Sequence, residues 1–138
     1  MHNFYGYEPR GRILRLASVN GFAIKELSPP KFARLFSSFT NFNNKFIFLI
    51  AGDIENGAVS KTGEVYDIHR NIWMDTPPLQ VARRSHSTCS FNNEKLYTFG
   101  GLVSGCDVIM DIEVLNAKRF LAGYQDCLWE CIVVSKER

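Results

Sequence analysis

The sequence predicts an all-β fold of antiparallel four-stranded sheets, and three observations support this. Two apolar runs, Phe46–Ile50 and Lys95–Phe99, each begin just after an Asn-Asn pair, a dipeptide that suits tight turns because Asn tolerates positive φ. No stretch of the chain shows convincing helical periodicity. Aromatic residues make up 13% of the chain, which β-rich cores favour.

The composition describes one ordinary globular domain. The chain has 138 residues, enough to bury its own core, with 46% hydrophobic and 22% charged residues. Its net charge of +2 is too small to indicate nucleic acid. Arg10, Arg12 and Arg15 could contact an acidic surface or a membrane, although a solvated edge is the simpler interpretation. We therefore expect neither a nucleic-acid nor a membrane partner.

Targeting signals and cysteines favour a cytoplasmic protein. The apolar run Phe46–Gly52 is far too short to span a bilayer. The N-terminal residues lack the order of a signal peptide, in which basic residues precede an apolar segment. Without a secretion signal, we interpret the four cysteines as reduced thiols: Cys89, Cys106, Cys127 and Cys131.

An internal repeat organises the chain. When residues 29–52 are aligned with residues 78–101 without a gap, eight of the 24 pairs are identical. The same offset of 49 residues pairs Glu64-Val65 with Glu113-Val114. A fixed period in this range indicates a solenoid or a propeller.

Each unit is predicted to contain four strands. In the first unit they cover residues 39–42, 46–50, 63–68 and 72–76, and in the second residues 85–91, 95–99, 109–115 and 128–134. Residues 13–30 have the length of the outer two strands of a preceding unit, with Leu16 and Ile24 where aromatic residues are expected.

These motifs together resemble the kelch repeat, whose period is about 50 residues. The resemblance is carried by Gly100-Gly101 at a strand end, the strand Glu64-Val65-Tyr66-Asp67, Trp73 seven residues after Tyr66, Pro77-Pro78 and the segment ARRSHS at 82–87. It covers residues 29–116 well and the ends weakly. Its structural positions in this chain are Gly52, Tyr66, Trp73, Arg83, Gly100 and Gly101.

The resemblance implies an incomplete β-propeller of four-stranded kelch blades, about two and a half in number. Residues 1–28 would form a partial N-terminal blade, 29–77 one kelch repeat, and 78–138 a second repeat with an insertion. Propellers typically close with four to eight blades. The chain is therefore a fragment, a subunit that assembles with itself or a partner, or a marginal partial propeller.

The chain departs from the kelch pattern at several positions. Ala51 replaces the first glycine of one pair, and Leu115 replaces the second tyrosine. Trp129 follows Leu115 by fourteen residues rather than seven, so residues 120–126 are predicted to be an insertion.

Several side chains are predicted to be structural. We expect Tyr66, Trp73, Phe91, Phe99 and Gly101 to be buried. A guanidinium at Arg34 or Arg83 can bind loop carbonyls or a neighbouring glutamate such as Glu64.

No catalytic, cofactor or metal site is predicted. Cys127 and Cys131 lie four residues apart on a predicted strand, about 13 Å by strand geometry and too far to share one zinc ion. Ser85, His86 and Ser87 are neighbours, but adjacent strand residues point to opposite faces. His86 is expected to pack structurally.

The function predicted from the resemblance is protein–protein interaction, as an adaptor or scaffold that binds through loop faces. The alternative is a structural subunit of a larger assembly, and an enzyme is much less favoured. Topology places three loops on one rim, at residues 53–61, 77–84 and 102–108. The candidate binding residues there are Asp53, Glu55, Asn56, Lys61, Gln80 and Arg84. The open propeller ends also predict self-association.

Overall fold

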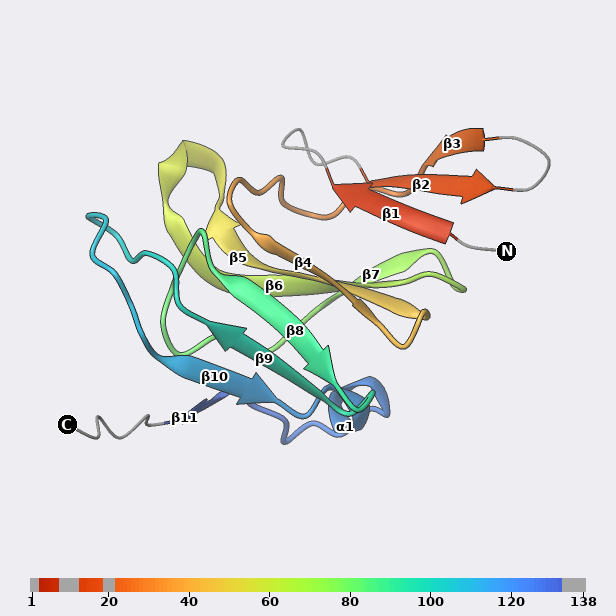
Figure 1. The fold of residues 1–138 in the computed structure, drawn as a ribbon. Helices are drawn as coiled ribbons and strands as arrows, with labels where there is room; N and C mark the ends of the chain where they lie inside the picture. The colour runs from red at the N-terminus through yellow and green to blue at the C-terminus, as the bar shows by residue number, and fades with distance from the viewer. Residues whose placement is uncertain (1–2, 8–12, 19–21, 133–138) are drawn as a thin grey trace.

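The computed structural model describes residues 3–7, 13–18 and 22–132. In this part of the chain the backbone forms three antiparallel sheets, one short α-helix and one turn of 3-10 helix at Glu55–Gly57 (Figure 1). The prediction of an all-β fold with four-stranded antiparallel sheets is confirmed, since two of the three sheets have four strands.

The first sheet has three strands, β1 (Asn3–Tyr7), β2 (Ile13–Ser18) and β3 (Phe22–Glu26), in the order β1-β2-β3. The sequence predicted two strands here, and the structure adds β1. Leu16 and Ile24 are paired across β2 and β3. Arg10 and Arg12 lie outside the described residues.

The second sheet has the order β4-β5-β6-β7. It contains β4 (Ser38–Phe42), β5 (Phe46–Asp53), β6 (Val59–Asp67) and β7 (Ile72–Asp75). Asn43 and Asn44 both adopt a φ of 54°, so the predicted turn residues do enter the left-handed region. β5 and β6 are longer than predicted, because pairing continues past an irregularity between Ile50 and Gly52.

The third sheet has the order β8-β9-β10-β11 along its width. It contains β8 (Ser87–Phe91), β9 (Lys95–Phe99), β10 (Ile112–Leu115) and β11 (Glu130–Ile132). β9 has the predicted bounds. β10 and β11 are shorter than predicted, and residues 133–134 of the last predicted strand lie outside the described residues.

A short helix overlaps the start of the insertion predicted at residues 120–126. α1 (Ala117–Leu121) begins after Asn116, whose side chain accepts a hydrogen bond from the Arg119 backbone N–H. Phe120 and Leu121 pack against the core. Five helical residues are too few to produce a periodic signal, so the sequence shows no convincing helical periodicity here.

The main core lies between the second and third sheets. It contains Phe42, Phe48, Ile50, Val65, Leu79, Leu96, Leu115 and Trp129. The two innermost strands, β4 and β8, are joined through Thr88, whose hydroxyl is 2.6 Å from that of Ser38 and whose carbonyl accepts a hydrogen bond from Thr40.

The opposite face of the second sheet turns toward the N-terminal strands. Tyr7 of β1 stacks on Phe39 with ring centroids 6.3 Å apart. The indole N–H of Trp73 donates to the carbonyl of Ser28 at 2.8 Å. The second sheet therefore has a neighbour on each side (Figure 1).

The backbone itself repeats with the 49-residue offset seen in the sequence. Positive φ angles occur in matching pairs at Phe36/Ser85, Asn43/Asn92, Asn44/Asn93, Ala51/Gly100 and Gly52/Gly101. Ala51 adopts this conformation even though it has a side chain. The two repeats are thus equivalent in conformation as well as in sequence.

Burial agrees with the sequence prediction at Tyr66 and differs at four other positions. Tyr66 is 1% exposed, whereas Trp73 and Gly101 are only half-buried. Phe91 is 58% and Phe99 41% exposed, so their predicted burial was wrong. Both lie on a face of the third sheet that no described sheet covers. Trp129 was not among the predicted core residues, yet it is buried.

Candidate protein-binding rim

A buried arginine anchors the linker that enters the second sheet. The guanidinium of Arg34 donates to the carbonyls of Ala51 and Thr62 at 3.1 and 3.0 Å, and it pairs with Glu64 at 3.4 Å. The expectation that Arg34 binds loop carbonyls and Glu64 is therefore confirmed. Burial lowers the pKa of Arg34, while the Glu64 carboxylate acts in the opposite direction.

Arg83 makes the same contacts one repeat later. Its guanidinium donates to the carbonyls of Gly100 and Asp111 at 3.2 and 3.0 Å and pairs with Glu113 at 2.6 Å. The side chains of Arg83 and Glu113 are both fully buried. Every partner of Arg83 named here is a partner of Arg34 shifted by 49 residues.

Each glutamate also binds the backbone of its linker. Glu64 accepts hydrogen bonds from the N–H groups of Lys31 and Phe32, and Glu113 accepts them from those of Gln80 and Val81. The linker is consequently fixed by charge-assisted hydrogen bonds to buried groups, which are stronger than neutral ones. This rigid attachment determines where the neighbouring loops lie.

Arg84 joins the three loops that the sequence placed on one rim. Its guanidinium pairs with Asp53 at 2.9 Å and donates to the Cys106 sulfur at 3.1 Å. Its backbone exchanges two hydrogen bonds with Leu102. The hydrogen bonds to Asp53 and then to Cys106 raise the pKa of Arg84. The linker, the β5–β6 loop and the β9–β10 loop thus meet at one end of the molecule (Figure 1).

The six candidate rim residues differ in their exposure and in their hydrogen-bond partners. Glu55 and Lys61 are exposed, and the side chain of Asn56 lies outside what the structure describes. Asp53 is buried and held by Arg84. Gln80 is exposed, and its side chain donates to the carbonyl of Trp129, the residue before β11, at 2.9 Å.

Exposed apolar side chains on the rim were missed from the sequence. They are Leu35, Phe36, Val108 and Met110, which are between 45% and 76% exposed. Leu35 exchanges backbone hydrogen bonds with Asp53, and the carbonyl of Phe36 accepts one from Ser85. For Leu35 and Phe36 the sequence did indicate exposure, because the equivalent positions in the second repeat are the polar Arg84 and Ser85.

Phe36 shares its backbone conformation with the equivalent residue of the second repeat. Phe36 has a φ of 54°, which is unusual for a bulky residue. Ser85 has a φ of 53° at the equivalent position, so this conformation belongs to the repeat and is independent of the side chain that it carries.

His86 is buried beside the rim and packs against the strand end at Gly101. Burial, followed by the nearby Arg83 charge, lowers its pKa to about 4. The imidazole is therefore neutral at pH 7.

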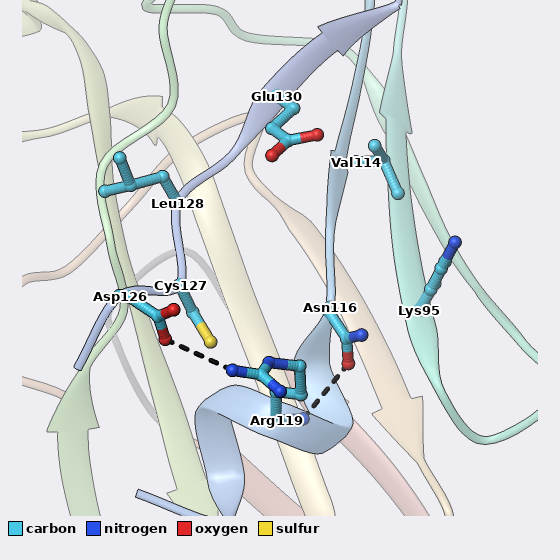
Figure 2. Close-up of a pocket in the computed structure, with 8 residues that line it drawn as sticks. All are labelled: Lys95, Val114, Asn116, Arg119, Asp126, Cys127, Leu128 and Glu130. Carbon is cyan, nitrogen blue, oxygen red and sulfur yellow. Dashed lines mark hydrogen bonds and ion pairs between the residues drawn. The ribbon is translucent and has the colours of Figure 1, made fainter. Parts of the chain in front are cut away.

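A shallow hollow of about 370 Å³ lies at the other end of the third sheet, beside α1 (Figure 2). It is lined by Lys95, Val114, Asn116, Arg119, Asp126, Cys127, Leu128 and Glu130. Arg119 pairs with Asp126 at 3.4 Å, and both side chains are largely solvent-exposed. The hollow mixes both signs of charge with apolar groups.

No group of three or more His, Cys, Asp or Glu side chains in the described residues is arranged to hold a metal ion. None of the helices in this part of the chain has the length and apolar character needed to cross a membrane.

Comparison of the whole chain with protein-family models gives no match, and comparison with curated proteins gives none either.

Proposed function

We propose that the chain is a kelch-type protein-interaction module that acts as an adaptor or scaffold through the Arg84 rim. This rim comprises the exposed side chains of Leu35, Phe36, Glu55, Lys61, Val108 and Met110 around the Asp53–Arg84–Cys106 contact. The observation that carries the proposal is the convergence of three loops from two consecutive repeats on Arg84.

The chemistry of the rim supports protein binding. Cores of protein interfaces are enriched in aromatic residues, Met and Arg, and their edges are polar. Phe36 and Met110 supply solvent-exposed apolar side chains, and Glu55 and Lys61 supply charges. Because buried pairs fix the linkers, the rim loses little conformational entropy when a partner binds.

The experiment is quantitative capture with the full chain as bait. Glu55→Lys and Lys61→Glu reverse exposed charges, and Phe36→Ser replaces the aromatic ring by the residue that the second repeat carries. We expect each variant to lose the same captured proteins while keeping the parent melting temperature. Lys118→Glu on α1, at the far end of the molecule, is the matched control and should capture normally. Loss of capture in the control, or none in the rim variants, would refute the proposal.

A structural subunit of a larger assembly is the second candidate function, favoured by the face of the third sheet that none of the described sheets covers. It predicts that the chain co-purifies with a stoichiometric, salt-resistant partner or associates with itself, whereas an adaptor partner exchanges readily. Light scattering coupled to size exclusion measures the mass. A monomer near 15.7 kDa at every concentration would contradict self-association.

A cytoplasmic location belongs to the same proposal. All four cysteines carry free thiols, and three of them are exposed. Exposed thiols persist most readily in a reducing compartment.

A further inference from the structure

One face of the third sheet is exposed, whereas the equivalent face of the second sheet is completely buried. In the second sheet, alternate residues of β4, β5 and β6 face the core, and Phe42, Phe48, Ile50 and Val65 are at most 3% exposed. Their counterparts 49 residues later lie on one face of β8, β9 and β10. These counterparts are Phe91, Tyr97, Phe99 and Val114, all of them exposed or half-buried.

Backbone groups show the same contrast. The linker of the second repeat binds the second sheet through three hydrogen bonds: Gly52 N–H to Arg83 C=O, Arg83 N–H to Ser60 C=O, and Leu79 N–H to Lys61 C=O. The equivalent groups of the third sheet are Gly101 N–H, Ile109 C=O and Met110 C=O. No described residue binds any of the three.

The way in which the second repeat covers the second sheet is therefore a model for the segment that covers this face. We call this model the template. The template is a linker that offers one carbonyl and two N–H groups in a fixed arrangement, followed by a four-stranded sheet with an apolar side. An ordinary globular partner could cover the apolar side chains, but the three backbone groups specify an extended linker in register with the rim end of the sheet.

We propose that this face binds one further repeat of the kind that the chain carries twice. The face consists of Phe91, Tyr97, Phe99 and Val114 together with Gly101 N–H, Ile109 C=O and Met110 C=O. The inference goes beyond the function proposed for the Arg84 rim, since it concerns the flat side of the third sheet and adjacent backbone groups rather than the exposed side chains of the rim.

Two charged residues at one end of this face restrict which partner surface can bind it. Lys95 and Glu130 stand where the second sheet has Phe46 and Met74, both of which pack against its core. These two charged side chains line the hollow beside α1 (Figure 2). The occupant thus needs an apolar surface opposite Phe99 and polar groups opposite Lys95 and Glu130.

The test supplies a repeat of known structure to the intact chain. The full chain is extended after Arg138 by a second copy of residues 77–132 in which the four cysteines are replaced by serine. Cys89 reports on the face, because it lies between Phe91 and Phe99 on the same side and its thiol is exposed. Its counterpart in the second sheet, Thr40, is buried.

We expect alkylation of Cys89, followed by mass spectrometry, to slow roughly tenfold or more in the extended chain because the thiol becomes buried. Phe99→Asp in the extended chain should restore the parent rate. The same substitution in the unextended chain should leave the melting temperature unchanged, since Phe99 is exposed there.

Three results would overturn the proposal. The first is a Cys89 rate that does not change on extension, whether the added copy folds or not. The second is protection that survives Phe99→Asp. The third is concentration-dependent protection in the unextended chain, which would identify a second copy of the chain as the occupant. Each result is independent of capture by the Arg84 rim, which is measured with other variants.

Discussion

Removal of the Glu113 carboxylate should destabilise the chain severely. Glu113 is fully buried and accepts hydrogen bonds from the Arg83 guanidinium and from the backbone N–H groups of Gln80 and Val81. Glu113→Ala would leave a buried positive charge without its counterion and two N–H groups without acceptors. The linker would then lose part of its attachment to the third sheet.

The magnitude follows from these contacts. Breaking a buried ion pair by removing one partner costs about 3–5 kcal/mol. Unsatisfied N–H groups add to that cost, while Arg83 keeps its hydrogen bonds to the carbonyls of Gly100 and Asp111. We therefore expect a loss of about 4 kcal/mol, a large part of the roughly 5–15 kcal/mol of a typical domain.

Urea unfolding followed by tryptophan fluorescence measures this loss. At a slope of about 2 kcal/mol per molar urea, 4 kcal/mol lowers the midpoint by about 2 M. Glu113→Gln keeps one acceptor oxygen and should cost less. Asp126→Asn, which breaks the exposed pair with Arg119, is the control and should cost at most about 1 kcal/mol. A Glu113→Ala midpoint no lower than that of the control would refute the anchoring role.

Three further predictions concern stability. His86 has a folded pKa of about 4 and an ordinary value near 6.5, so the unfolded chain binds the proton more readily. The contribution of His86 to the free energy of unfolding should be constant above about pH 6.5 and fall by roughly 3 kcal/mol toward pH 4. Urea titration at each pH measures this drop, which should be smaller in His86→Phe. Gly52→Ala should lower the melting temperature far more than Gly105→Ala. Both residues have a φ of +85°, but only at Gly52 would a Cβ lie 2.5 Å from a backbone oxygen. Trp129→Ala should cost about 3–5 kcal/mol in urea, and more than Trp73→Ala, because Trp129 alone is fully buried.

The repeat made much of the fold predictable. An Asn-Asn turn and a following apolar run define a hairpin locally, so the pairing of β4 with β5 and of β8 with β9 follows from short segments. The offset of 49 residues then transfers each assignment to the other repeat. The arginine contacts were partly predictable for the same reason, because Arg34 and Arg83 occupy equivalent positions.

Burial was less predictable, because it depends on what lies against a strand and not on the strand itself. Phe91 and Phe42 are the same residue in the same local structure, yet one is exposed and the other is buried by the third sheet. The sequence pattern cannot distinguish them.

The rim was predicted in location but only partly in composition. Strand order alone places the three loops together. The pairing of Asp53 with Arg84 needs their side-chain positions, and the exposure of Phe36 depends on a positive φ that its residue type does not suggest.

Protein binding by the Arg84 rim is the function that we propose. Hydrogen–deuterium exchange of the full chain, alone and with a partner captured as described above, tests it most directly. Slower exchange confined to residues 53–61 and 102–110 is the predicted result. Unchanged exchange in both segments, with protection instead at the opposite turns of residues 43–45 and 92–94, would show that the partner does not bind the rim.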